Sequence, residues 1–191
     1  MTCALILGLV ALAGLATAWG GRAQSLVAGL SAGLGAPQMV WLVALLCGAP
    51  TALVMGLAGA ALAAGHGPSH RGLLIAAALL AAAFDLMLTV RRSAPQEPTR
   101  SLGAIALVLS ARQMVDAPRW LAFASGAAMD DGLLPALAVT TGSGAALALA
   151  AFAPGLVADH GRAMLARRIL ALALLAASVW AGFHSLPASP Q

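Results

Sequence analysis

Polar side chains of types that bind protons and ions interrupt an apolar stretch in the second half of the chain. Residues 113–119 read Gln-Met-Val-Asp-Ala-Pro-Arg, and residues 18–24, at the matching place in the first half, read Ala-Trp-Gly-Gly-Arg-Ala-Gln. A carboxylate among apolar residues is costly unless it is paired or faces a cavity, so it is a functional hint in itself. Asp116 is therefore the first candidate for proton or ligand binding, with Gln113 and Gln24 as polar ligands.

Positive charge surrounds Asp116 in the sequence. Arg112 precedes it by four residues and Arg119 follows it by three, so on a continuous helix all three side chains can share one face. One interpretation is an ion pair within the helix, and the other is a carboxylate that takes part in transport. Pro118 removes a backbone donor and should kink the helix. Arg22 adds positive charge in the first half, so the three arginines can tune the charge of a shared cavity.

Composition places these residues in a membrane protein. The chain has 191 residues, of which 61% are hydrophobic and 8% charged, and its mean hydropathy is +0.95. Soluble proteins carry about 25% charged residues, so this chain has too few to cover a water-facing surface. Apolar runs of about 20 residues recur along it, as expected of transmembrane helices. The formal charge of +4 comes from arginines near helix ends, which indicates topology control and no nucleic-acid partner.

Six membrane-spanning helices account for the apolar runs, so the predicted fold is an all-α integral membrane protein. Residues 91–100 form the only long polar segment and separate two halves of three helices each. The first span is interrupted near Gly20-Gly21. The predicted spans are residues 2–34, 37–64, 72–90, 102–128, 133–158 and 164–183.

The two halves are similar in sequence layout. A shift of 95 residues lays Gly21 on Asp116, and a shift of 94 lays residues 64–67 on 158–161. An odd number of spans per half forces the halves into opposite orientations, which is the inverted repeat of many secondary transporters, with a site between broken helices. The predicted units are a first three-helix repeat (1–92), a polar linker (93–101), a second three-helix repeat (102–186) and a tail (187–191).

Arginine placement predicts the orientation of the spans. The positive-inside rule puts the arginine-rich side in the cytoplasm, while the opposite side receives only Arg71. Both termini are then outside the cytoplasm of a multi-pass protein of the bacterial inner (plasma) membrane. The arginines assigned to the cytoplasmic side are Arg91, Arg92, Arg100, Arg162, Arg167 and Arg168.

This layout resembles the cation/proton antiporter family of Golgi and bacterial manganese and calcium transporters, within the wider lysine-exporter-like superfamily. That family carries Glu-φ-Gly-Asp-Lys/Arg-Thr/Ser in each half. Gln113 and Asp116 occupy the acidic positions of the second motif, and Ala18 and Gly21 those of the first. The resemblance implies a metal/proton antiporter in which Asp116 binds the metal, with the bilayer, a small inorganic ion and a proton as partners.

The motifs depart from the family pattern in charge. Asp116 is the only acid of the four expected, and against Arg22, Arg112 and Arg119 it leaves one negative and three positive charges, a net of +2. Hard divalent cations need several oxygen ligands, usually including carboxylates. One alternative is the same fold transporting an anion or an organic acid. Another is a non-transporting membrane protein with an assembly or regulatory role.

Further polar residues have less specific patterns. Asp85, near the end of the third span, is either a buried counter-ion for Arg22 or Arg119 or a side chain directed to the lipid headgroups. His66 and His70 supply two ligands, too few for a zinc centre. Nucleophile-elbow, metalloprotease and phosphate-loop motifs are absent from the sequence, so we expect neither an enzyme nor a cofactor.

Overall fold

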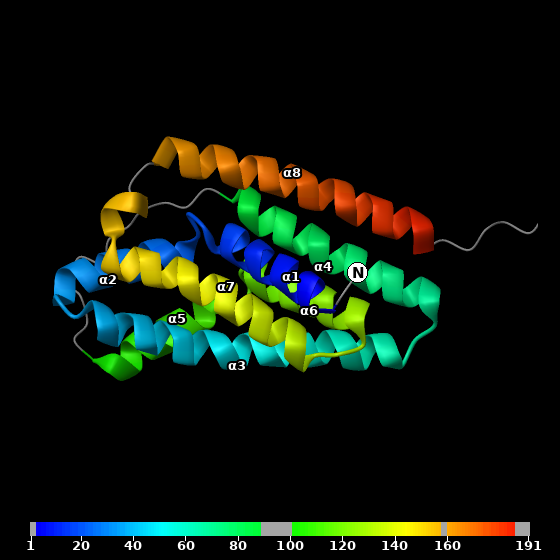
Figure 1. Ribbon diagram of the computed structural model, residues 1–191, viewed down its shortest axis with the longest axis horizontal. Coiled ribbons are helices and arrows are strands. Elements are labelled where there is room, and N and C mark those ends of the chain that lie inside the picture. Colours follow the sequence, from blue (N-terminus) through cyan, green and yellow to red (C-terminus); the bar gives the residue numbers. More distant parts are fainter. Residues whose placement is uncertain (1–2, 89–100, 158–159, 186–191) are drawn as a thin grey trace, which may run out of the picture.

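The computed structural model describes residues 3–88, 101–157 and 160–185, and every regular element in these ranges is a helix (Figure 1). Most of the predicted polar linker, the predicted tail and three of the topology arginines, Arg91, Arg92 and Arg100, lie outside the described residues. The elements are α1 (Cys3–Ala18), α2 (Arg22–Leu34), α3 (Pro37–Ala64), α4 (Pro68–Met87), α5 (Leu102–Gln113), α6 (Ala117–Met129), α7 (Leu133–Phe152), the 3-10 turn η1 (Pro154–Val157) and α8 (His160–Ser185).

The helices run back and forth along the long axis of one bundle (Figure 1). Helices α1 and α2 together run in one direction, α3 returns, and α4, the α5–α6 pair, α7 and α8 continue the alternation. The packing has matched pairs: α1 lies on α7 and α5 on α3, while α2 lies on α7 and α6 on α3. Helix α8 packs along α4 at one side.

The observed bounds differ from the predicted spans where proline acts. Helix α3 has the predicted bounds, but α4 begins at Pro68 rather than at residue 72, because proline suits the first turn of a helix. Helix α7 ends at Phe152, just before Pro154, and only the short η1 turn continues toward residue 158. The first and fourth predicted spans are each two helices, broken at residues 19–21 and 114–116.

Several helices can cross a membrane. Helices α3, α4, α7 and residues Gly161–Ser185 of α8 are long and apolar enough, and the α1–α2 pair, bent by 66°, makes a fifth candidate. Large apolar side chains on the outer faces support this, since Phe183 is 71% and Leu107 72% exposed. The chain is therefore an all-α protein of multi-pass membrane type. The α5–α6 segment carries three charged residues, and a sixth span there remains a prediction.

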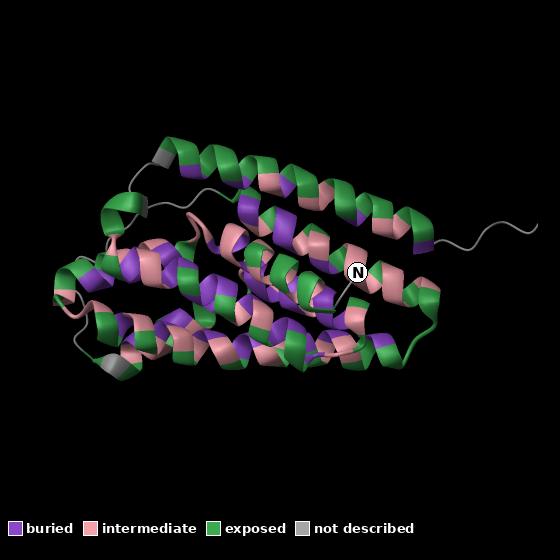
Figure 2. Cartoon of the chain, viewed as in Figure 1, coloured by how far each residue is buried: buried purple, intermediate pink, exposed green. Residues whose placement is uncertain are grey.

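Glycines allow the inner helices to touch backbone to backbone. A Cβ atom on Gly59 or Gly126 of the α3–α6 pair would collide with the main chain of Phe123 or Gly56, respectively. Gly142 of α7 meets the backbone of Ala11 in α1 in the same way. Close approach at small residues is how helices associate where lipid removes the hydrophobic driving force. Buried residues accordingly gather on the inward faces, while the outer face of α8 is mostly exposed (Figure 2).

Polar contacts join the connections at the end of the bundle where α3 turns into α4 and α6 into α7. Arg71 pairs with Asp130 at 2.8 Å and donates to the carbonyl of Ala128. Asp131 accepts from the first backbone N–H groups of α7, as a capping residue does. This end is therefore tied by an exposed ion pair and tight glycine contacts.

Candidate functional site

The first helix break is built from glycine and one buried amide. Gly20 has φ +65°, a left-handed conformation that residues with a Cβ adopt at a cost. The Gly20 backbone N–H donates to Gln24 Oε1 at 2.6 Å, and Gln24 Nε2 donates to the carbonyl of Ala146 in α7 at 2.8 Å. Gln24 is fully buried. Its amide therefore holds the break against α7, and both of its polar atoms already have protein partners.

The N-terminus of α2, by contrast, has no side-chain cap. Its N-cap residue Gly21 is extended and supplies no side-chain cap. The first N–H groups of a helix lack partners within the helix and carry partial positive charge. Arg22 begins the helix with an exposed side chain, and its guanidinium has no hydrogen-bond partner among the described residues. The first break therefore has hydrogen-bond donors, the first N–H groups of α2 and the Arg22 guanidinium, without a side-chain partner among the described residues.

The second helix break is capped by two carboxylates. Asp116 is the N-cap of α6, and its Oδ1 accepts from the Arg119 backbone N–H at 3.3 Å. Asp85 of α4 accepts from the Ala117 backbone N–H at 3.0 Å. Pro118 lies in the first turn of α6, where its missing N–H is not needed. The carboxylates satisfy the donors and favour the positive end of the helix.

The break changes the predicted relation of the charged residues. Arg112 lies in α5 and Asp116 is the N-cap of α6, so the continuous helix that would place Arg112, Asp116 and Arg119 on one face does not exist. The ion pair that does form joins Arg119 Nη1 to Asp116 Oδ2 at 3.4 Å. Neither sequence interpretation of Asp85 describes its position, because its carboxylate caps α6 instead of pairing with Arg22 or Arg119 or turning to the headgroups.

Arg119 is a buried cation with a partner for each nitrogen. Its side chain is 2% exposed, and its Nε donates to Thr51 Oγ1 at 3.1 Å. Its Nη2 donates to Gln113 Oε1 at 3.4 Å, and Gln113 in turn donates to the carbonyl of Ala44 at 3.1 Å. Gly48 leaves the space, because a Cβ there would lie 2.5 Å from Nη2. Arg119 and Gln113 are therefore committed to holding α3, α5 and α6 together.

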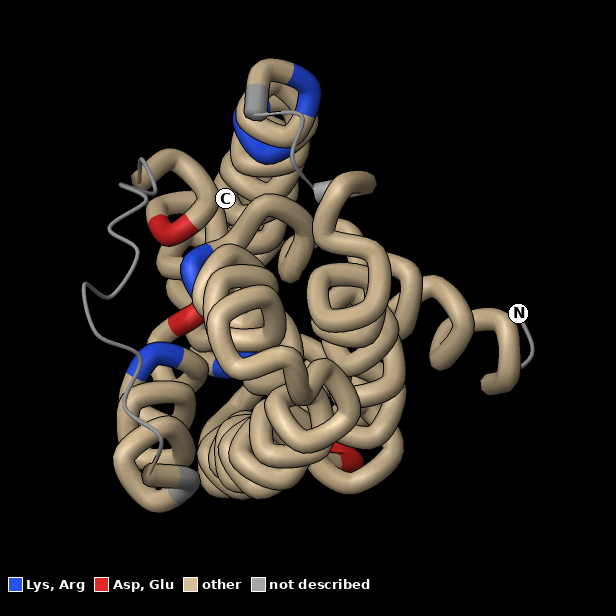
Figure 3. The backbone as a smooth tube through the Cα atoms, turned by 90° about the vertical axis from the view of Figure 1, so that its left-hand side faces the viewer, with Lys and Arg blue, Asp and Glu red and all other residues tan. Residues whose placement is uncertain are grey.

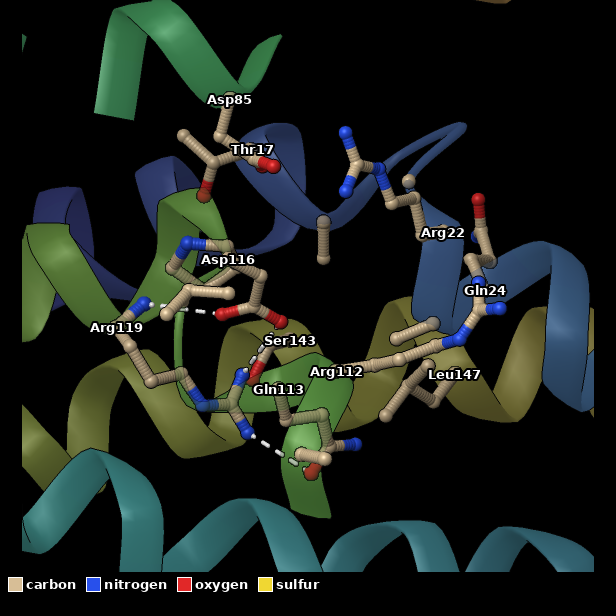
Figure 4. A pocket seen from close by; sticks show the side chains of 16 residues that line it. Thr17, Arg22, Gln24, Asp85, Arg112, Gln113, Asp116, Arg119, Ser143 and Leu147 are labelled. Carbon is tan, nitrogen blue, oxygen red and sulfur yellow. Dashed lines mark hydrogen bonds and ion pairs between the residues drawn. The ribbon is translucent and has the colours of Figure 1, made fainter. Parts of the chain in front are cut away.

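One cavity of about 440 Å³ lies between the two breaks (Figure 4). Residues from α1, α2, α4, α5, α6 and α7 line it, and Thr17, Ser143 and Leu147 join the charged groups. Seen from one end of the bundle, the arginine and aspartate positions gather mainly toward one side (Figure 3). All seven residues predicted from the sequence as site candidates line this cavity: Gln24, Arg22, Asp85, Arg112, Gln113, Asp116 and Arg119.

Some charged side chains of the cavity have hydrogen-bond or ion-pair partners within the protein, and others have none among the described residues. Three arginines and two aspartates line it, a formal net of +1. Asp85 and Asp116 accept from the α6 N-terminus, and Arg119 pairs with Asp116. Arg22 and Arg112 are exposed, and their guanidinium groups have no partner in the described part of the chain. The cavity arginines without a partner in the described residues are therefore Arg22 and Arg112, while Asp85 keeps one carboxylate oxygen without a hydrogen-bond donor there.

Comparisons with protein-family models, curated proteins and solved structures gave no significant match. The resemblance to the cation/proton antiporters therefore stays a prediction from motifs and helix layout.

Potential metal ligands are sparse. Within residues 3–88, 101–157 and 160–185, three or more His, Cys, Asp or Glu side chains nowhere gather closely enough to hold a metal. His66 on the α3–α4 connection and His70 in the first turn of α4 have ring centroids 5.7 Å apart. Asp85 and Asp116 are the two acids of the cavity.

Sequence reasoning missed Arg167, which it treated as a marker of topology. Its side chain lies inside the bundle, 6% exposed, and donates to the carbonyls of Trp19 and Asp85. A signal was present in the sequence, because Ala163 and Ala171 lie four residues to either side and place Arg167 on a stripe of small residues. Such a stripe is the packed face of a membrane helix. Thr17 and Ser143 of the cavity were missed as well, and no pattern marks them.

Proposed function

We propose that this chain is a multi-pass transporter of the bacterial inner membrane, with two inverted three-helix repeats and a solute site in the central cavity. The observation that carries the proposal is that both helix breaks, one from each half, line a single open cavity with charged side chains in an otherwise apolar bundle. Broken helices that meet near the middle of a bundle are the recurring site architecture of secondary transporters.

The helix packing supports the repeat in part, because the α4–α6 packing has no comparable α8–α2 counterpart among the described residues. Exchange of the halves turns α1 into α5, α2 into α6 and α3 into α7, and it turns the α1–α7 contact into the α5–α3 contact. The α2–α7 contact becomes the α6–α3 contact in the same way, while α3–α7 and α4–α8 map onto themselves. The alternating directions of the helices in Figure 1 fit six crossings with both termini on one side, which arginine counting assigns to the outside.

The cavity favours a small anion or organic acid as the solute. Guanidinium groups bind carboxylates and phosphates through paired, charge-assisted hydrogen bonds. Arg22 and Arg112 are the cavity cations without a protein partner in the described structure, and they come from different halves. The uncapped N-terminus of α2 lies beside them and adds partial positive charge. These groups would hold an anion without displacing any contact that stabilises the bundle.

Manganese or calcium exchange against protons is the second candidate, because Asp85 and Asp116 line the same cavity. Calcium binds six to eight oxygen ligands. Both Asp116 oxygens already accept from Arg119, and Gln24 Oε1 and Gln113 Oε1 already accept from protein donors. A cation bound at Asp116 would compete with Arg119 for the same oxygens, and displacement of Arg119 would leave a guanidinium buried without its carboxylate, which is a costly step. We therefore rank this function second.

Flux in proteoliposomes tests the proposal. Uptake of radiolabelled lactate and succinate is measured for the wild type, Arg22→Gln, Arg112→Gln and the control Arg168→Gln, which removes the same charge from an exposed site on α8. We expect wild-type uptake of at least one acid, lost in the two cavity variants and retained in the control. Manganese- or calcium-dependent proton flux that disappears in Asp116→Asn would instead establish the second candidate. Absence of all these fluxes would contradict transport of either class.

A further inference from the structure

Arg167 lies on α8, beside the α1–α2 break and the last turn of α4. It is 6% exposed, whereas its neighbour Arg168 is exposed, so the helix turns one arginine inward and the next outward. Arg167 is not among the residues that line the cavity. The buried face around it consists of Ala163 and Ala171, which leave room for a long side chain between α8 and the breaks.

The guanidinium group binds two carbonyls that helix ends have left free. Nη1 donates to the Trp19 carbonyl at 3.3 Å, in the turn between α1 and α2, and Nη2 donates to the Asp85 carbonyl at 3.1 Å, in the last turn of α4. Carbonyl groups at the end of a helix have no partner within it, and inside a membrane each must be satisfied by protein. The hydrocarbon stem of Arg167 also packs beside Gly20.

Asp85 extends this contact to the second break. Its carbonyl accepts from Arg167, while its side chain accepts from the Ala117 backbone N–H at the start of α6. A single residue of α4 therefore lies between Arg167 and α6. The series Trp19, Arg167, Asp85, Ala117 is a continuous set of hydrogen bonds from the α1–α2 break to the α5–α6 break.

We propose that Arg167 is a positioning residue that ties the two helix breaks to each other through Asp85. The two breaks then keep one relative position while the contacts persist, and movement of one break relative to the other requires one of these three hydrogen bonds to break. This tie is a property of the resting protein. Its consequence for transport, a change in turnover without loss of the cavity arginines, rests on the proposed function.

Backbone hydrogen exchange measures the tie directly and does not require transport. Peptides that cover residues 17–24 and 113–119 are followed by mass spectrometry in the wild type, Arg167→Ala, Arg167→Lys and the control Arg168→Ala. Loss of the two contacts should increase the opening of both segments, and we expect about tenfold faster exchange in Arg167→Ala. Lysine has a single ammonium group and cannot hold both carbonyls with the planar fork of arginine, so Arg167→Lys should be intermediate.

A second variant distinguishes a tie between the two breaks from an effect of Arg167 on one break alone. Asp85→Ala removes the bond to the Ala117 N–H but keeps the carbonyl that binds Arg167, so it should accelerate exchange in residues 113–119 and leave 17–24 near the wild-type rate. Faster exchange in only residues 17–24 of Arg167→Ala would overturn the tie, and so would wild-type rates in both segments. If Arg167→Ala also accelerates exchange in the α3 core around Ala52, its bundle has opened generally. The tie is then tested with Arg167→Lys, by whether exchange in residues 17–24 and 113–119 is faster than in the wild type.

Transport provides the second readout. In the proteoliposome assay, Arg167→Ala should change kcat about tenfold for the transported acid and leave KM within about twofold, because the residue lies outside the cavity. A rise in KM with unchanged kcat would assign Arg167 to solute binding and overturn the positioning role. Failure of transport in the wild type would contradict the proposed function alone, since the hydrogen-exchange result does not depend on it.

Discussion

The two helix breaks occupy matching places in the halves of the chain, yet they are stabilised in opposite ways. The α5–α6 break is capped by Asp116 and Asp85 and held by the buried Arg119. The α1–α2 break depends on Gly20, has no side-chain cap, and leaves Arg22 exposed to the cavity. The charged and hydrogen-bonding groups at the second break therefore have protein partners, whereas Arg22 and the N-terminus of α2 at the first break do not have them among the described residues.

This difference separates the frame of the site from its binding groups. A buried ion pair is costly to desolvate, and removal of one partner is more costly than the pair itself. Arg119 and Asp116 therefore persist together as part of the frame. The unpaired guanidinium of Arg22 has no such constraint and remains available for a solute. This difference between the two breaks predicts how substitutions at each one change the stability of the protein.

Removal of Arg119 should have the largest effect on stability. Arg119→Ala removes the side-chain donors of Asp116 Oδ2 and Gln113 Oε1 and opens a void beside Gly48. Loss of one partner of a buried pair costs about 3–5 kcal/mol. Thermal unfolding in detergent, followed by size-exclusion chromatography, should show a strongly lowered midpoint. Arg22→Ala is the matched control and should unfold near the wild-type temperature, and equal midpoints for the two variants would contradict the contrast.

A smaller loss is expected when the space for Arg119 is filled. In Gly48→Ala the new Cβ would lie 2.5 Å from Arg119 Nη2, so the guanidinium or α3 must shift. Overpacking of this kind costs about 1–3 kcal/mol. The same unfolding assay measures it against Gly29→Ala, where no neighbouring atom lies within 4 Å of the added Cβ. A Gly48→Ala protein as stable as Gly29→Ala would show that Arg119 is not held where the structure places it.

The first break should be sensitive to backbone conformation instead of charge. Gly20→Ala places a Cβ at φ +65°, beside Ala163, and a left-handed residue costs about 1–2 kcal/mol. Gly8→Ala in the middle of α1 meets no neighbour and is the control. The expected result is a lowered unfolding midpoint for Gly20→Ala alone. Equal midpoints would mean that the α1–α2 turn does not need glycine.

The sequence predicted the helical elements better than the contacts of their polar residues. Apolar runs placed α3 at its observed bounds, and Gly20-Gly21 and Pro118 marked both breaks. The seven site candidates meet in one cavity because polar residues in an apolar helix turn inward to avoid lipid. Their roles in binding remain predictions.

The sequence could not predict which of these residues contact one another. Spacing arguments assume an unbroken helix, so they joined Arg112 to Asp116, whereas the break turned Asp116 into a cap for α6. Arginine counting used Arg167 only as a marker of the cytoplasmic side because it ignores the face on which a side chain lies. Gln24 and Gln113 remain predicted ligands. The sequence did not show that their amide nitrogens donate to the backbone carbonyls of Ala146 and Ala44, which tertiary packing alone brings near.

Solute binding to charge-altered cavities tests the central claim most directly. Saturation binding of radiolabelled succinate and lactate to purified protein is compared between Arg22→Gln and Asp116→Asn. If the uncommitted arginines form the site, Arg22→Gln loses at least tenfold in affinity, about 1.4 kcal/mol, and Asp116→Asn binds the acid at least as well as the wild type. Loss of binding in Asp116→Asn with full affinity in Arg22→Gln would contradict the account and make the capped second break the binding site.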